Sequence, residues 1–146
     1  MKKPATLLAV LPLLLGAVAM PSPAAEPAQA VKLAAAPVFS IFMLVRTTPQ
    51  WLALKPEQRF AFLGSDIEPI LKKHPGVRMR FFDSEAYNAR VSDVILWETA
   101  DLGRYQSVVE SLRESRFWGT YFEVVDILPA IENAYAAHYD VKPVGK

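Results

Sequence analysis

The chain has 146 residues, of which 52% are hydrophobic and 21% charged, and this composition suits one globular domain with an apolar core. Its net charge is only +1, which excludes a nucleic-acid partner that needs a concentrated positive field. It contains no cysteine, so disulfides, thiol catalysis and a lipid-modified cysteine are excluded as well.

Residues 1–30 have the layout of a secretory signal peptide. Lys2 and Lys3 form a basic start, an almost unbroken apolar run follows, and small residues come after it. The apolar run is shorter than the roughly twenty residues that span a bilayer as a helix. Small residues at the positions before the bond permit cleavage after Ala19 or after Ala30. The sequence therefore predicts an exported protein, periplasmic or secreted, with no membrane attachment after cleavage.

Beyond the signal peptide, we expect a disordered leader over residues 31–37, a folded domain over residues 38–139 and a polar tail over residues 140–146. The leader is rich in proline and alanine and has few large apolar groups. The domain begins with VFSIFMLV, residues 38–45, a continuous apolar and β-branched run. Such a run is typical of a central strand that is covered on both faces.

A helix is predicted from Pro56, because a proline is tolerated in the first helical turn. Apolar residues and one histidine then recur at steps of three and four, as on one face of an amphipathic helix. These residues are Phe60, Leu63, Ile67, Ile70, Leu71 and His74. Pro69 lies inside this pattern and predicts a kink. After Pro75 and Gly76, residues 77–82 alternate in polarity and predict a less buried strand.

Three more elements complete the predicted domain. Residues 91–98 form a strand, Asp101 is the N-cap of a second helix that runs to about Ser115, and residues 123–128 form the last strand. Pro129 is expected to end that strand, and a short helix follows near the C-terminus. The order is β-α-β-β-α-β with a C-terminal helical extension, the arrangement of ferredoxin-like α+β domains.

The predicted assembly follows from the first strand. In a ferredoxin-like domain both helices cover the same face of the sheet, yet residues 38–45 are apolar on both sides. An exposed apolar face of this size is uncommon in a monomer. We therefore expect a homodimer of the dimeric α/β barrel type, in which two sheets pack face to face.

Three stretches of the chain resemble a known family: FMLVRTTPQWL, LKKHPGVRMRFFDSEAYNARVSDVILWE and FWGTYFEVVDILPAIENAYA. Together they are similar to the Darcynin family, small bacterial and fungal proteins regarded as a domain of unknown function. The resemblance extends over residues 38–139. It implies a ferredoxin-like or dimeric α/β barrel fold and supplies no established catalytic residue.

The candidate site lies in residues 80–98, where ionisable and aromatic side chains are densest. Charged groups there suit a hydroxylated or anionic small molecule held by charge-assisted hydrogen bonds, and aromatic groups supply flat walls. The predicted ligand-binding residues are Arg80, Asp83, Tyr87, Arg90, Trp97 and Glu98. The alternative is that the same charges form an ion-pair network that only stabilises the assembly.

Catalysis remains open in the sequence. His74, at the end of the first helix, is the candidate general base, with a capping role as its alternative. The two histidines are far apart and stand at no metal-ligand spacing, so no metal is predicted, and no cofactor motif is found. The leading hypothesis is the binding of a small aromatic or carboxylated molecule in a cleft between sheet and helices. The alternatives are a cofactor-independent oxygenase or isomerase and a non-catalytic structural dimer.

Overall fold

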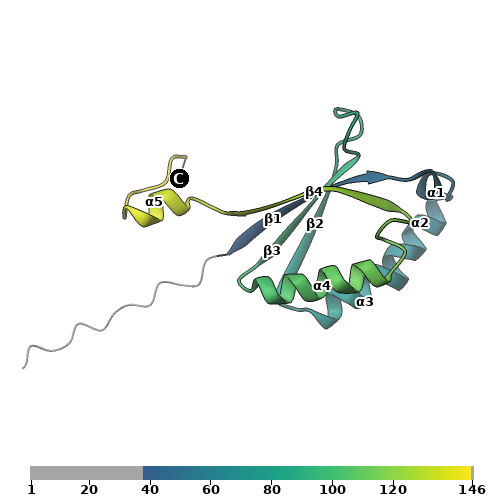
Figure 1. Cartoon of the computed structure of the whole chain (residues 1–146), viewed down its shortest axis with the longest axis horizontal. Helices are drawn as coiled ribbons and strands as arrows, with labels where there is room; N and C mark the ends of the chain where they lie inside the picture. The colour runs from purple at the N-terminus through teal and green to yellow at the C-terminus, as the bar shows by residue number, and fades with distance from the viewer. Residues whose placement is uncertain (1–37, 146) are drawn as a thin grey trace, which may run out of the picture. The chain divides into compact units, whose positions relative to one another are not determined.

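The computed structural model describes residues 38–145, and the predicted signal peptide and leader lie outside this range. Four antiparallel strands form one sheet in the order β2-β3-β1-β4 (Figure 1). The strands are β1 (Phe39–Thr47), β2 (Val77–Asp83), β3 (Asp93–Thr99) and β4 (Phe122–Ile131). The helical elements are α1 (Pro49–Leu52), α2 (Pro56–Phe62), the π-helical turn η1 (Leu63–Ile67), α3 (Glu68–Lys73), α4 (Leu102–Glu114) and α5 (Ala134–His138). The predicted ferredoxin-like order is confirmed.

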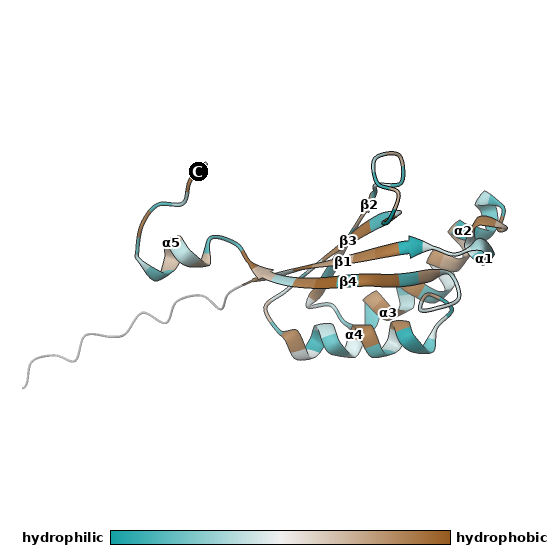
Figure 2. Cartoon of the chain, turned by 45° about the horizontal axis from the view of Figure 1, so that its top comes forward, coloured by the Kyte–Doolittle hydropathy of each residue, from teal (hydrophilic) through white to brown (hydrophobic). Residues whose placement is uncertain are grey.

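The core lies between the sheet and the helices. Figure 2 shows α3 and α4 on the same side of the sheet. Ile41, Met43 and Val45 alternate along β1 and are completely buried on that side. The largest buried side chains of this layer are those of Trp97 in β3 and Phe122 in β4. Burial of such side chains contributes about 1.5–3 kcal/mol each and is the main force that holds the helices on the sheet.

The long helical segment from Pro56 to Lys73 is interrupted where the sequence predicts a kink. The turn η1 is π-helical and ends directly before α3, in which Pro69 occupies the first turn. A proline inside a helix removes one backbone donor and crowds the preceding turn. A locally widened turn is one of the recognised ways in which a helix adapts at such a point.

Several features differ from the sequence-based expectation. Pro129 was expected to end the last strand, but it lies inside β4 opposite Ile41. This is tolerated because β4 is an edge strand, where the missing N–H is not needed by a second neighbour. β3 begins at Asp93, two residues later than expected. The short helix α1 was not predicted; Thr48 initiates it by accepting a hydrogen bond from the Trp51 amide.

The opposite face of the sheet, here called the open face, is partly apolar and has no helix of the described chain across it. Phe42 in the central strand is 37% exposed there, and Phe82 of β2 is 45% exposed. The large apolar residues on this face include Phe42, Leu44, Phe82, Val94, Leu96 and Leu128. Both sides of β1 are therefore lined by apolar residues, as the sequence indicates. Within residues 38–145 no helix has the length and apolar character needed to cross a membrane.

Candidate functional site

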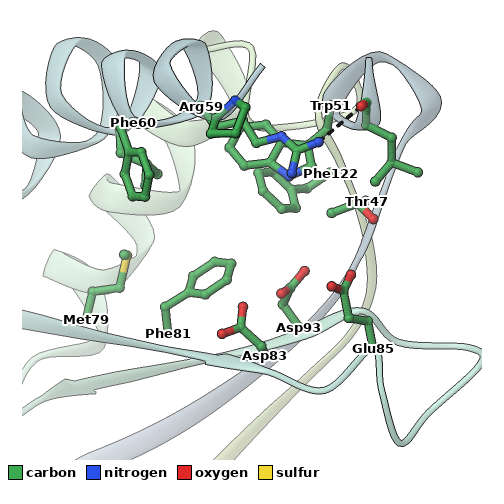
Figure 3. Close-up of a pocket in the computed structure, with 13 residues that line it drawn as sticks. Thr47, Trp51, Arg59, Phe60, Met79, Phe81, Asp83, Glu85, Asp93 and Phe122 are labelled. Carbon is green, nitrogen blue, oxygen red and sulfur yellow. Dashed lines mark hydrogen bonds between the residues drawn. The ribbon is translucent and has the colours of Figure 1, made fainter. Parts of the chain in front are cut away.

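A cavity of about 510 Å³ opens between α1, α2 and one end of the sheet, on the side of the helices. Figure 3 shows aromatic side chains along one part of its wall and three carboxylates gathered at another part. The lining residues are Thr47, Trp51, Leu52, Pro56, Arg59, Phe60, Leu63, Met79, Phe81, Asp83, Glu85, Asp93 and Phe122. The volume falls within the range of about 300–1,000 Å³ that is usual for small-molecule sites.

The aromatic wall is fixed by the short helix α1. The Thr48 side chain caps α1 and also donates to the Thr120 carbonyl, which ties this helix to the segment before β4. Trp51 is thereby packed against Phe122, with ring centroids 4.8 Å apart. Phe81, 40% exposed, and Phe60, 73% exposed, add two rings to the wall. The result is an apolar wall of aromatic rings suited to an aromatic molecule.

Arg59 is the positively charged group of the cavity. Its guanidinium lies 5.6 Å from the centre of the Trp51 ring, and Nη2 donates a hydrogen bond of 3.0 Å to the Leu52 carbonyl. Nε is buried and has no hydrogen-bond partner among the described residues. Figure 3 shows the guanidinium beside Trp51, on the other side of the cavity from the carboxylates.

The three carboxylates come from the β2–β3 hairpin. Asp83 ends β2 and pairs in register with Asp93, which begins β3, while Glu85 lies in the connecting loop. Asp93 is only 4% exposed, and Oδ2 accepts a hydrogen bond of 2.6 Å from the Ser92 hydroxyl. Burial raises the pKa of Asp93, the Ser92 hydrogen bond opposes this rise, and the charges of Asp83 and Glu85 add to it.

None of these charged groups is neutralised by a neighbour within residues 38–145. Arg59, Asp83, Glu85 and Asp93 form no ion pair there, although they line the same cavity. Of the four, only Asp83 was among the predicted ligand-binding residues. Arg59 was not singled out, because nothing in a helical sequence shows which charged side chain turns towards a distant hairpin.

The structure separates the predicted ligand-binding residues. Arg80 and Glu98 lie on the open face, where Glu98 bonds both Arg80 and Arg78. Asp83 lies on the opposite side of the sheet, in the cavity. The expectation that Arg80, Asp83, Arg90 and Glu98 come together is therefore wrong, because residues an odd number of positions apart in a strand point to opposite faces.

The other predicted residues also lie apart from the cavity. Trp97 is completely buried in the core, and Tyr87 is 92% exposed in the β2–β3 loop. Arg90 lines a smaller hollow of about 240 Å³, together with Asn88, Leu44 and Asp126. Asn88 shapes this loop, because its side chain accepts hydrogen bonds from the amides of Arg90 and Val91.

His74 is distant from the cavity. It ends α3, just before β2 begins, whereas the carboxylates lie at the other end of β2. A strand of this length spans roughly 20 Å. His74 therefore does not share a site with Asp93. Among residues 38–145, no group of histidine and acidic side chains is arranged to hold a metal ion.

The fold is that of a ferredoxin-like α+β protein, and solved structures similar to it include chlorite dismutases. A mutant chlorite dismutase from Candidatus Nitrospira defluvii aligns with 73% of the chain and 45% of its own length, with a TM-score of 0.57 and 14% identity. A putative chlorite dismutase aligns with 75% of the chain and 50% of its own length, with a TM-score of 0.58 and 21% identity. The chain thus spans about half the length of these structures, and the likeness shows the fold alone.

The chain belongs to the Darcynin family. The family, described as a domain of unknown function, matches residues 26–146. A Darcynin homolog of Granulibacter bethesdensis is 51% identical over 104 residues, which are 70% of this chain and 84% of that protein. A Darcynin homolog of Streptomyces avermitilis is 47% identical over 109 residues, 74% of this chain and 90% of that protein. The resemblance seen in the sequence is confirmed.

Proposed function

We propose that this protein binds a small organic molecule with a flat, apolar body in the cavity beside α1 and α2. The proposal is supported by one observation above all: a cavity of about 510 Å³ combines aromatic walls with four charged groups that have no ion-pair partner in the described chain. Asp83 and Glu85 are exposed to water, but Asp93 is buried and Arg59 is partly buried. A buried charge without a partner costs free energy. A bound molecule can supply the missing polar contacts and cover the apolar walls at the same time.

The charges of the cavity indicate which polar groups such a molecule carries. Three carboxylates face one guanidinium, so the potential inside the cavity favours hydrogen-bond donors and disfavours anions. An aromatic ligand agrees with the walls made by Trp51, Phe81 and Phe122. The carboxylated ligand considered from the sequence suits these charges less well than an uncharged or cationic one.

The test is ligand binding to the chain without residues 1–37, measured by the shift of the unfolding temperature with a matched set of aromatic molecules. The set comprises phenethyl alcohol, phenethylamine and phenylacetate, which differ only in charge and polar end group. We expect the alcohol or the amine to raise the unfolding temperature and phenylacetate to have no effect. Binding to the native state alone stabilises by mass action, so the shift must grow with ligand concentration.

Two neighbouring phenylalanines provide a matched control. Phe81 lines the cavity and is 40% exposed, whereas Phe82 is 45% exposed on the open face. Phe81→Ala should weaken ligand binding, and Phe82→Ala should leave it unchanged. Equal loss of binding in both variants, or no stabilisation by any of the three molecules, would contradict the proposed cavity function.

For the open face we propose a second copy of this chain as the partner, which gives the predicted dimeric α/β barrel. The face exposes Phe42 and Leu128 beside the partly exposed Arg80–Glu98 ion pair. The solved neighbours are about twice as long as the part that this chain matches. A second copy that packs sheet against sheet would supply an equivalent amount of structure, and a symmetric partner needs no other gene product.

The dimer is tested by the molar mass of the protein in solution, measured by light scattering during size-exclusion chromatography. Phe42→Asp places a charge in the middle of the open face and should give a folded monomer, because the buried side of β1 is unchanged. Phe81→Ala should remain dimeric. A wild-type protein that is monomeric at high concentration would overturn this proposal without affecting the cavity.

We also propose that the domain acts after export, on the strength of the basic, apolar and small residues in order along positions 1–30. Expression of the whole chain in a bacterium with a periplasm tests this. The expected product is periplasmic or secreted, and its N-terminal residue, determined by mass spectrometry, is Met20 or Val31. An uncleaved chain that stays in the cytoplasm would contradict export.

A further inference from the structure

The position of Asp93 in the cavity suits a general base. Its carboxylate is buried at the start of β3, and Ser92 donates to Oδ2 over 2.6 Å. Ser92 is itself held in place, because its hydroxyl oxygen accepts a hydrogen bond of 2.8 Å from the Thr47 amide. Oδ1 accepts no hydrogen bond from any described residue. One oxygen of the carboxylate is therefore fixed, and the other is free to receive a proton from a bound molecule.

The surroundings of Asp93 also make it a better base than a carboxylate in water. Burial raises its pKa, and the nearby charges of Asp83 and Glu85 raise it further against the effect of Ser92. A carboxylate with a raised pKa holds an abstracted proton more strongly, which increases the driving force for proton transfer. This electrostatic effect supports a role that the position of Asp93 in the cavity already indicates.

Arg59 supplies the second group that such chemistry needs. Its guanidinium is held by the Leu52 carbonyl and by the Trp51 ring, and it faces the carboxylates across the cavity (Figure 3). It forms no ion pair in the described chain, and Nε has no hydrogen-bond partner. A fixed cation opposite a base is the arrangement that stabilises negative charge as it develops on an oxygen.

We propose that the cavity catalyses the enolisation of a small, uncharged aromatic ketone or aldehyde, with Asp93 as the base and Arg59 as the group that receives the oxyanion. This inference rests on the proposed binding of an aromatic molecule in the same cavity. Asp83 and Glu85 repel anionic substrates, so the carbonyl compound is uncharged. The rings of Trp51, Phe81 and Phe122 hold its aromatic part.

The step is balanced without an oxidant or a cofactor. The Asp93 carboxylate removes a proton from the carbon next to the carbonyl, and the electron pair of that C–H bond moves to form the carbon–carbon double bond. The electron pair of the carbonyl double bond moves onto its oxygen, where Arg59 stabilises the enolate. Asp93 then returns a proton, and the carbonyl double bond forms again. Return to the same carbon gives only hydrogen exchange, whereas return to a conjugated carbon shifts a carbon–carbon double bond and isomerises the molecule.

The experiment follows the exchange of hydrogen for deuterium in β-tetralone, an uncharged ketone fused to a benzene ring, by proton NMR in deuterated water. The wild-type protein should accelerate exchange above the rate in buffer alone. Asp93→Asn should lower the enzymatic rate by roughly 100-fold or more, the size expected for loss of a general base. Asp126→Asn, which alters an exposed carboxylate outside this cavity, is the matched control and should keep the wild-type rate.

The dependence of the rate on pH separates a base from a residue that only maintains the structure. The wild-type rate should rise as the pH rises through the pKa of Asp93, because the base must be ionised. Ser92→Ala removes the hydrogen bond that lowers this pKa, so its profile should shift to higher pH. A merely structural change would lower the rate without moving the profile.

Two further outcomes separate the enolisation from ligand binding in the cavity. Binding of β-tetralone in the NMR spectra without faster exchange than in buffer, or with equal exchange in Asp93→Asn, overturns the enolisation and leaves ligand binding intact. If neither β-tetralone nor the aromatic alcohol and amine bind, the enolisation and the cavity function are both overturned.

Discussion

Two groups of charged residues lie on opposite sides of the sheet, and they differ in how they are neutralised. On the open face, Glu98 bonds Arg78 and lies 3.4 Å from Arg80. In the cavity, Arg59 and the three carboxylates have no ion pair, and Asp93 directly faces Asp83 in the register of the hairpin. The first group is satisfied within the chain, and the second is not.

This difference shows which group is suited to a ligand. Paired charges at a partly exposed surface add little to stability and ask for no further partner. Like charges that face one another beside an apolar wall reduce stability, and natural sequences keep such features mainly where function requires them. Dense charge in a sequence does not distinguish the two cases, because the distinction depends on which side of the sheet each side chain lies.

The largest expected effect concerns Trp97, which the sequence suggested as a wall of the binding site. It is completely buried in the core, so Trp97→Ala should lower the free energy of unfolding by about 3–5 kcal/mol. Phe81→Ala, in the cavity wall, should cost much less because that ring is already 40% exposed. Chemical denaturation measures both. Equal losses would show that the cavity wall belongs to the core and would remove the contrast between them.

A smaller effect is expected from Asp93→Asn, and its sign depends on pH. The pKa of Asp93 is raised by burial above its ordinary value of 3.8, so the ionised side chain opposes folding. This opposition is absent below the ordinary value and grows as the pH rises through the raised pKa. The variant should therefore unfold at a higher temperature than the wild type near neutral pH, and its advantage should shrink at acidic pH. If the two proteins differed by the same unfolding temperature at every pH, the pKa of Asp93 would not be raised in the folded state.

Most of the fold could be predicted from the sequence, since it is encoded locally. Residues 38–45 form a short, continuous apolar and β-branched run, whereas apolar residues from Phe60 onwards recur at steps of three and four, and this difference distinguishes strand from helix. The strand that continues through Pro129 was missed because its tolerance of proline depends on its place at the edge of the sheet. That place is a property of the whole topology.

Part of the site was also within reach of the sequence. Strict alternation along β3 places Asp93 on the same side as Trp97 and opposite Glu98, so the predicted cluster could have been divided by counting. Arg59 could not have been found in this way. Its guanidinium is positioned by contacts with Leu52 and Trp51 of α1, a helix that was not predicted.

Tyr105 tests whether every unpaired polar group indicates a ligand. Its hydroxyl is buried near Trp97, has no hydrogen-bond partner in the described chain and does not line the cavity. Tyr105→Phe should raise the free energy of unfolding by about 1 kcal/mol, because the buried hydroxyl no longer loses its hydration. Burial also raises the pKa of Tyr105 to about 12, so the wild type should lose stability between the ordinary value of 10.0 and that pH, and the variant should lose less. Loss of ligand binding in this variant would contradict the assignment of the site to the cavity.

The smallest effects on stability should come from the loss of surface ion pairs, and two glutamates allow a comparison. Glu98 is partly buried and bonds two arginines, whereas Glu123 bonds only Arg46 and is more than half exposed. At low protein concentration, Glu98→Gln should lower the free energy of unfolding by about 1 kcal/mol and Glu123→Gln by less than about 0.5 kcal/mol. Both losses should shrink in high salt, because solvent ions screen exposed charges. If either variant abolished ligand binding while Asp83→Asn did not, the paired charges of the open face would be the functional ones and the comparison of the two faces would be reversed.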